Sequence, residues 1–530
     1  MNVSIDFIDS RTTSENSAKV TVSRTVSEYE PATFEEAITA TKFGKYNILL
    51  AFLAMLSSFC TVFDTSTMSY TFVAAQCDLE LSLSDKGLLN AVTYAGMITS
   101  AIIWGFLFDV LGRKKLLIFG FLVDAIFVFT SAFSQSLPLL LASKYLQGFI
   151  INGPFAAVSS YISEFHCAMY RPVYQMIIGT SNSFGTVLLP LLAWVILPQN
   201  MDFTIVKLNF HSWNVFLLVS GLPAFLSAIM YLLFPESPKF LMTSGQNDKA
   251  LKVFQKIFSV NTGQPPECYP IKHLVDETQN TSTNETSTKR NTLQALKEGF
   301  QQIKPICLPP QLVRILLACT IFLFVTMSLN ILRLWLPQIF QIMTDYQEAH
   351  EEEPAGLCTM LMESIDGKNS SSSEECEVNV SNDSTYINST IVGCTAICGN
   401  LLAASLIRHI GKKKILTVAL IIAGSCGVFL YFSENPELAV FCSSMFIAGG
   451  SVSNNVMVSV AVDMFPTTLR TMAISLGLMI GRSGAMFGNF IFPYLLQTGC
   501  EAPFFFIGGS MLAAAILSLA LPNTDMKPLT

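Results

Sequence analysis

The sequence has 530 residues, of which 51% are hydrophobic and only 13% are charged. A soluble chain carries roughly twice that share of charged residues, so the composition excludes an ordinary water-soluble protein. The formal net charge of −7 gives no reason to expect a nucleic-acid partner. Apolar runs of about twenty residues recur, each long enough to cross about 30 Å of hydrocarbon. Because barrel strands need only about ten residues each, the runs predict an all-α polytopic membrane protein.

Residues 1–45 are polar, rich in Ser and Thr, and without an apolar core. We therefore predict no cleaved signal peptide and a disordered cytoplasmic tail. Twelve membrane-spanning helices are predicted after this tail. They form a first six-helix half at 46–234 and a second at 312–521, separated by a cytoplasmic linker at 235–311 and followed by a cytoplasmic tail at 522–530. The predicted spans are 46–72, 87–108, 114–134, 138–162, 173–196, 213–234, 312–336, 389–409, 413–432, 437–461, 471–494 and 502–521.

The distribution of cations predicts the orientation of these spans. With both termini in the cytoplasm, the outer side carries only three lysines, Lys86, Lys207 and Lys368. This asymmetry is the positive-inside pattern, and the opposite topology would reverse it. The short inner turns then hold Arg113, Lys114, Lys115, Arg171, Arg408, Lys412, Lys413, Lys414 and Arg470. These cations set the topology, and they could also contact anionic lipid.

Two long connections differ in character. In the inner linker, DKALKVFQKIF at 248–258 predicts a short amphipathic helix. The outer connection at 341–388 carries eleven acidic residues against one lysine, and it also holds a cluster of Asn-x-Ser/Thr sequons. Clustered sequons on the lumenal side predict N-glycosylation. The sequons are at Asn369, Asn379, Asn382 and Asn388, of which Asn388 is closest to the membrane and the least favoured.

Most of the thirteen cysteines fall in spans or inner loops, where they behave as small apolar residues. Four lie on the outer side, and four cysteines allow three complete pairings. We favour a Cys358–Cys376 disulfide because these two residues share one loop, and the alternative is four free thiols. The outer cysteines are Cys77, Cys358, Cys376 and Cys500.

A repeat connects the two halves of the chain. GFLFDVLGRKKLL at 105–117 and LIRHIGKKKIL at 406–416 both place a glycine before three cations, and Gly112 and Gly411 are 299 positions apart. The same offset relates Glu164 to Asp463 and Arg171 to Arg470. Charged turns that recur at one spacing indicate a duplicated unit, and hence two equivalent six-helix halves.

This architecture resembles the major facilitator superfamily, whose loop motif is Gly-x-x-x-Asp-x-x-Gly-Arg-Arg/Lys. The resemblance implies that the two halves rock about a central site near the bilayer midplane. It also implies that Asp109 anchors the inner turn and pairs with cations in one conformer, as a latch. The second half has Arg408 in place of this acid, so we expect no such latch there. The motif stands here as Gly105, Asp109, Gly112, Arg113 and Lys114.

A narrower resemblance is to the synaptic vesicle glycoprotein 2 family. It rests on HSWNVFLLVSGLPAF at 211–225, PESPKFLMTSGQNDKALKVF at 235–254 and SYISEF at 160–165. The outer loop of about 48 residues is too short for the folded lumenal domain that the family resemblance implies, so the chain resembles a shortened relative.

Charged residues within spans are candidate site residues, because each costs a few kcal/mol unless it is paired or hydrated. Asp64, within FCTVFDTSTMSY, has polar neighbours and could bind a cation or a proton; otherwise it is a carboxylate hydrogen-bonded to neighbouring helices. Arg482, within GLMIGRSGAMFG, could bind an anionic substrate group or pair with Asp64. If the two face one another, each offsets part of the other's desolvation cost.

Three further charges have alternative interpretations. Lys144 in the fourth span could contact substrate or extend to the outer surface, and Arg333 near the outer end of the seventh could do the same. Asp124 lies on the third span, where the resemblance implies a peripheral helix and favours an interhelical hydrogen bond.

The sequence has no Walker A motif, no nucleophile elbow and no His/Cys cluster with metal-ligand spacing. We therefore expect no enzyme, no metal and no cofactor. The seventh span lacks Gln-Gln-x-Ser-Gly, which disfavours a hexose porter. We expect a monomeric secondary transporter of a small organic solute, with alternating access and ion coupling through Asp64, in a vesicle or plasma membrane. The alternative is a non-transporting glycoprotein of the same membranes that binds protein partners.

Overall fold

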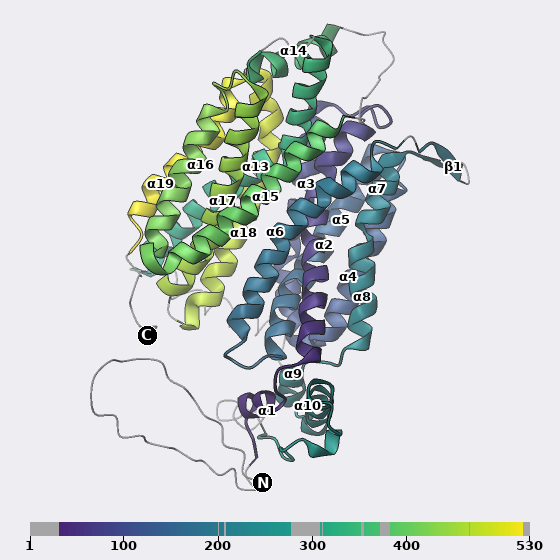
Figure 1. Cartoon of the computed structure of the whole chain (residues 1–530), viewed down its shortest axis with the longest axis vertical. Helices are drawn as coiled ribbons and strands as arrows, with labels where there is room; N and C mark the ends of the chain where they lie inside the picture. Colours follow the sequence, from purple (N-terminus) through teal and green to yellow (C-terminus); the bar gives the residue numbers. More distant parts are fainter. Residues whose placement is uncertain are drawn as a thin grey trace.

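The computed structural model describes residues 31–199, 201–205, 208–276, 308–309, 311–350, 355–370, 382–465 and 467–522. Helices occupy all twelve predicted spans, which confirms the two six-helix halves. Figure 1 shows the halves as neighbouring bundles, coloured purple to teal and green to yellow. By length and composition, eight of the described helices are able to cross a membrane.

The first half contains α2 (Lys45–Ala75), α3 (Leu83–Leu111), α4 (Arg113–Ala132), α5 (Leu137–Glu164) and α6 (Arg171–Ile196). Its sixth span is split into α7 (Ser212–Ser220) and α8 (Leu222–Leu233). The second half contains α13 (Gln311–Ala349), α15 (Asp383–Ile410), α16 (Lys412–Phe429), α17 (Pro436–Met464), α18 (Thr467–Thr498) and α19 (Glu501–Leu519). Helices α3, α2 and α6 of the first half pack against α18, α13 and α15 of the second.

Long apolar side chains cover much of the outer surface of both bundles. Leu233 is 73% exposed and Ile516 is 70% exposed. A water-soluble protein avoids such large exposed apolar surfaces, whereas lipid tails accommodate them. The two halves are therefore hydrophobic on the outside as well as in their packed cores.

The repeated glycines form the same turn in each half. Gly112, between α3 and α4, has φ 83° and ψ 160°, and Gly411, between α15 and α16, has φ 92° and ψ 150°. A side chain is strained at such positive φ values, so glycine permits these turns. At Gly112 an added Cβ would also lie 2.9 Å from the Phe240 ring. The offset of 299 residues therefore reflects a repeated backbone conformation.

A small helical layer lies beyond one end of the first half, where α1 (Phe34–Ala40), α9 (Pro238–Thr243) and α10 (Asn247–Thr262) lie close together (Figure 1). Helix α10 confirms the predicted amphipathic helix. Helix α1 corrects the prediction that all of residues 1–45 are disordered, because Thr33 and Glu36 form a capping box at its start. Phe34 then packs against Phe254 of α10. Burial of this apolar face offsets the entropy cost of ordering the segment.

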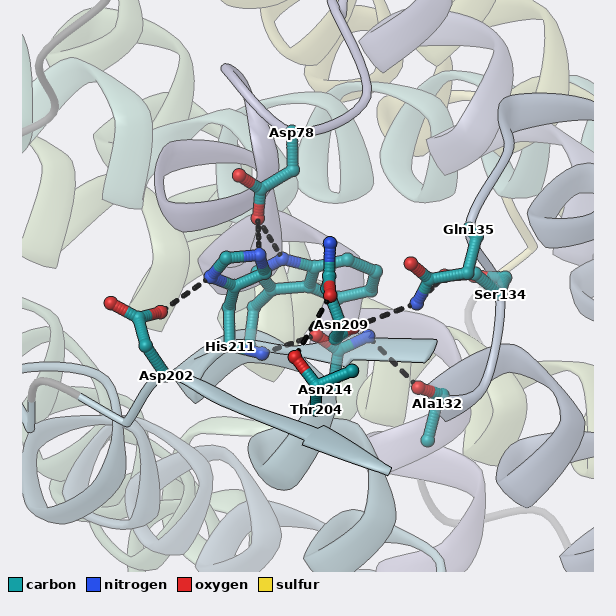
Figure 2. Close-up of polar contacts among 10 residues, drawn as sticks. Asp78, Ala132, Ser134, Gln135, Asp202, Thr204, Asn209, His211 and Asn214 are labelled. Atoms are coloured by element: carbon teal, nitrogen blue, oxygen red, sulfur yellow. Dashed lines mark hydrogen bonds and ion pairs between the residues drawn. The ribbon is translucent and has the colours of Figure 1, made fainter. Parts of the chain in front are cut away.

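The opposite end carries α14 (Leu357–Ser370) and the antiparallel pair β1 (Phe203–Ile205) and β2 (Leu208–Phe210) (Figure 1). Polar contacts connect this hairpin to the helices, as Figure 2 shows. His211 Nδ1 lies 2.7 Å from Asp202 Oδ1, and Trp213 Nε1 donates to Asp78 Oδ2 at 2.6 Å. These contacts join the connection after α2 to the hairpin and to the start of α7.

The predicted Cys358–Cys376 disulfide is wrong, because Cys358 is bonded to Cys500. Sharing a loop does not bring two cysteines together when part of that loop is helical. Helix α14 carries Cys358 to the connection between α18 and α19, where its Cα lies 5.5 Å from that of Cys500. Cys77 is also disulfide-bonded, and Cys376 lies outside the described residues.

Candidate functional site

A cluster of charged side chains is buried among α2, α4 and α5 of the first half. Asp64, Asp124 and Lys144 are exposed by 3%, 0% and 0%, respectively. Gln147 Nε2 donates to Asp64 Oδ1, and Lys144 Nζ donates to Thr67 Oγ1 at 3.1 Å. Asp124 interacts electrostatically with both Asp64 and Lys144. The cluster therefore combines two carboxyl groups and one amine in an interior from which solvent is largely excluded.

Helical spacing explains how these residues converge. Lys144 and Gln147 are three positions apart on α5, and Asp64 and Thr67 are three apart on α2. Residues at this spacing lie on one face of a helix, so two contacts between α2 and α5 form side by side. Thr67 and Gln147 provide neutral partners, which lowers the cost of holding the charges in an apolar bundle.

The structure separates the alternatives for two of the predicted residues. Lys144 does not extend to the outer surface, because its side chain is fully buried and its amine points to Thr67. Asp124 on α4 interacts with the carboxyl group of Asp64 on α2, which fits the interhelical contact expected for it. That Asp124 joins the charged cluster was not predicted from the sequence. A carboxylate within an apolar run was the available signal.

Arg482 and Asp64 do not form an ion pair in the described structure. Arg482 Nη1 donates to Asn152 Oδ1, so the arginine of α18 contacts a neutral amide on α5 of the other half. Asp64 contacts Gln147, which lies on α5 five residues before Asn152. The two charges thus meet neighbouring parts of α5, and each has a neutral partner. Asn152 was not singled out in the sequence because a lone amide within a span carries little signal.

A second contact between the halves involves α3 and α13. Tyr94 Oη donates to Asn330 Oδ1 at 2.8 Å. Arg333 Nη2 donates to Asn330 Oδ1 at 2.7 Å and to Tyr94 Oη at 3.2 Å. Arg333 therefore takes part in a hydrogen-bonded group that connects the halves. Tyr94 and Asn330 were both missed in the sequence, where neither residue is charged.

A cavity of about 230 Å³ lies between the halves, bounded by α2, α6, α13, α15 and α17. Arg333 is the sole charged residue among the described residues that line it, and none of those is acidic. The polar part of the lining consists of Tyr70, Asn182, Ser183, Thr186, Arg333, Ser389, Ser451, Asn454 and Asn455. A cavity with this lining can bind a small polar solute.

At the helix ends beside the repeated glycines, the repeated charges form equivalent contacts. Arg113 Nε lies 3.3 Å from Glu164 Oε1 in the first half, and Lys412 Nζ pairs with Asp463 Oδ2 in the second. The backbone N–H of Lys114 donates to Glu236 Oε1 at 2.9 Å. This contact places the carboxylate of Glu236 at the start of α4. Negative charge is favourable at this end of a helix.

The other repeated arginines are not equivalent. Arg171 pairs with Glu35 of α1, whereas Arg470 Nε has no hydrogen-bond partner among the described residues. The side chain of Asp109, the predicted latch residue, lies outside the described part of the structure, as does that of Arg408. The latch therefore stays a prediction.

The predicted glycosylation sites lie at the end of the bundles that carries α14. Asn382 is the N-cap of α15, and Asn388 lies within that helix. The side chain of Asn369 and the whole of Asn379 lie outside the described residues. Within the described residues, no group of three or more His, Cys, Asp or Glu side chains is placed to hold a metal ion.

Comparisons with known proteins agree with this geometry. The family model of the Major Facilitator Superfamily matches residues 54–365 and 371–529. Synaptic vesicle glycoprotein 2B of Rattus norvegicus is 22% identical over 588 residues, which cover 93% of this chain and 85% of that protein. Synaptic vesicle glycoprotein 2A of Homo sapiens is 30% identical over 236 residues, which cover 44% of this chain and 32% of that protein.

Solved structures show the same fold. A crystal structure of a D-xylose–proton symporter superposes with a TM-score of 0.63 at 16% identity, covering 91% of this chain and 99% of the other. The xylose transporter from E. coli in an inward-open conformation gives the same TM-score, covering 91% and 98%. The fold and the cavity between its halves define an integral, multi-pass membrane protein of the transporter class. The chain belongs to the Major Facilitator Superfamily, and it is distantly related over its full length to synaptic vesicle glycoprotein 2B.

Proposed function

We propose that the protein is a secondary active transporter of a small organic solute, which works by alternating access and is coupled to protons through Asp64. The observation that carries this proposal is the buried cluster of Asp64, Asp124 and Lys144. Two carboxylates and one ammonium leave one excess negative charge in a low-dielectric interior, and one bound proton neutralises it. A group that gains and loses a proton in this position can change the stability of one transporter conformation relative to the other.

The contacts between the halves support movement about the cavity. Arg482 and Arg333 reach the first half through the neutral partners Asn152 and Tyr94. A hydrogen bond between a charged group and a neutral partner contributes about 1.5–3 kcal/mol, so these contacts can still be exchanged during a conformational change. The ion pairs at the inner ends lie within each half, which favours movement of the halves as rigid units. The same proposal places the protein in a vesicle or plasma membrane with both termini in the cytoplasm.

Uptake by proteoliposomes that contain the purified protein tests this function. Vesicles with an inward proton gradient are incubated with a metabolite extract, and their contents are compared by mass spectrometry with those of empty vesicles. We expect solutes that accumulate only with the gradient, and a loss of at least about tenfold for Asp64→Asn. Asp202→Asn is the matched control, because this carboxylate is exposed at the outer hairpin. Uptake that is equal with and without the gradient contradicts proton coupling, and no uptake of any solute favours the non-transporting alternative.

A further inference from the structure

We propose that the solute is a small organic anion whose carboxylate binds Arg333 in the cavity between the halves. This inference rests on the proposed function, because it names the solute class for the same cavity. Its starting point is charge. Two buried acidic residues, Asp64 and Asp124, are held with Lys144 inside the first half, whereas the described cavity lining carries one cation and no acid.

Among the described residues, the Arg333 guanidinium donates its hydrogen bonds to neutral groups. Its Nη2 atom donates to Asn330 Oδ1 and Tyr94 Oη, and both acceptors are neutral. Its Nε atom is buried and has no hydrogen-bond partner among the described residues. An arginine presents donors in a planar fork that matches a carboxylate, so an unused donor beside a cavity is a site for that group. The neutral partners hold the side chain in place and leave the charge available.

The rest of the lining suits the body of a small polar molecule. Tyr70 on α2 faces both Arg333 and Ser389, and Asn182 on α6 has a buried carbonyl oxygen that no described residue contacts by a hydrogen bond. Ser451 on α17 is held by Asn400, whose amide donates to it at 3.0 Å. These groups can donate and accept hydrogen bonds to hydroxyl or amide groups of a solute. At about 230 Å³, the cavity has room for a small organic solute.

Charge-selective labelling tests the potential in the cavity without knowledge of the solute. Ser451→Cys places a thiol in the lining, and its reaction rates with an anionic sulfonatoethyl and a cationic trimethylammonioethyl methanethiosulfonate are compared after subtraction of the parent protein's own signal. One charge without a counter-ion in a cleft changes the local concentration of ions about tenfold or more. We expect the anionic-to-cationic rate ratio to fall about tenfold when Arg333→Gln is added. Arg314→Gln, a cation at the inner start of the same helix, should leave the ratio unchanged.

Paired solutes test the carboxylate itself. Lactate and lactamide, and benzoate and benzamide, have similar sizes and differ in charge, and each is tested for its effect on the apparent Tm of the purified protein. We expect stabilisation by at least one carboxylate and by neither amide. Arg333→Gln should remove this stabilisation, and Arg333→Lys should retain part of it, which separates lost charge from misfolding. A labelling ratio that does not change with Arg333→Gln, or amides that stabilise as well as carboxylates, would overturn the inference.

The outcomes for the two proposals can be distinguished. If carboxylates stabilise the wild-type protein through Arg333 but no solute enters proteoliposomes, the anion site stands and the transport proposal fails. If proton-driven uptake occurs but the solutes taken up are neutral or cationic, the transport proposal stands and the anion site is overturned. Stabilisation by none of the four probes, together with an unchanged labelling ratio, also overturns the anion site.

Discussion

Arg113 Nε lies 3.3 Å from Glu164 Oε1, and this ion pair joins the start of α4 to the end of α5. In the second half, Lys412 pairs with Asp463 and joins α16 to α17 in the same way. Each cation directly follows a glycine with positive φ. The repeat in the sequence is therefore a repeat of contacts inside each half, and neither pair connects one half to the other.

Because the two ion pairs lie in different halves, we expect their contributions to stability to be additive. Glu164→Gln and Asp463→Asn should each lower the free energy of unfolding by up to about 1 kcal/mol, since these charges are partly exposed. The double variant should lose the sum of the two, within about 0.5 kcal/mol. Apparent Tm values in detergent check this, with Glu267→Gln as an exposed control. A loss well beyond the sum would show that the pairs are coupled across the halves.

The buried cluster predicts a rescue experiment. Lys144→Met removes the amine and leaves Asp64 and Asp124 as uncompensated buried acids. In soluble interiors, breaking such a pair costs about 3–5 kcal/mol, so we expect little folded protein. Adding Asp124→Asn removes one of the stranded charges and should restore much of the yield. Yield is measured by fluorescence-detected size exclusion, with Lys249→Met as an exposed control. Normal folding of the Lys144→Met variant would show that the amine is not needed to balance the charges of Asp64 and Asp124.

Much of the fold could be predicted from the sequence, because lipid leaves the backbone few alternatives. Hydrogen bonds that cannot be made to the solvent must be made within helices, so apolar length alone locates the spans. The offset between Gly112 and Gly411 located the equivalent turns, since both need a backbone conformation that favours glycine. Asp64 and Lys144 were identified for a similar reason, because a charge in an apolar run needs a partner.

The partners themselves could not be predicted in the same way. Which residue a buried charge meets depends on the rotation of its helix, and the sequence contains no measure of that rotation. Arg482 accordingly meets Asn152 instead of Asp64. The Cys358–Cys376 prediction failed for a related reason, because the folded loop brings Cys358 to the distant Cys500.

The burial of His166 leads us to expect that the folded protein loses stability as the pH falls. It lies in the inner connection between α5 and α6, and it is 1% exposed. Burial lowers the pKa of His166 to about 4, with a further contribution from nearby Arg171. The unfolded state, with a pKa of about 6.5, therefore takes up the proton first as the pH falls. The folded state should be fully favoured above about pH 6.5 and lose about 2 kcal/mol by pH 5.

Comparison with His166→Gln isolates this contribution from that of other titrating groups. The wild-type protein should lose more apparent Tm than the variant between pH 7 and pH 5 in detergent. Nδ1 of His166 lies 2.7 Å from the Ile162 carbonyl oxygen, which glutamine can also reach as a donor. Equal losses in the two proteins would mean that His166 is not the group responsible.

The disulfide between Cys358 and Cys500 predicts a reducible cross-link between α14 and the connection from α18 to α19. Cys358 and Cys500 are 142 residues apart, so their bond closes a long loop and restricts the unfolded chain. Removing such a bond costs about 2–5 kcal/mol. We expect Cys358→Ser with Cys500→Ser to lower the apparent Tm and to make the protein less sensitive to a reducing agent. Cys394→Ser, which changes an exposed free cysteine, serves as the control. An unchanged Tm in the double variant would contradict a stabilising bond.

The last prediction concerns glycans on the outer loop. We expect N-linked glycans at Asn369, Asn379 and Asn382, so peptide N-glycosidase should increase the mobility of protein from a eukaryotic host. Asn388 lies inside α15, where the acceptor backbone is helical, and we expect no glycan there. At Asn382 the obvious substitution is ambiguous, because its Oδ1 atom also caps α15 by accepting from the Ser384 N–H at 3.0 Å.

Ser384→Ala resolves this ambiguity, since it destroys the sequon and keeps the backbone N–H that the cap uses. The glycosidase-induced mobility shift of this variant should be smaller by the contribution of one glycan, with little change in Tm. Thr390→Ala, which destroys the sequon at Asn388, should leave the shift unchanged. The side-chain amide of Asn382 also donates to Glu348 at 2.5 Å, and attachment of a glycan uses that nitrogen. The glycan must then replace one of its two hydrogens, so Glu348→Gln should leave the extent of glycosylation unchanged or raise it. If glycosidase treatment changes nothing while a control glycoprotein shifts, the loop is not lumenal, and the orientation predicted from the cations is wrong.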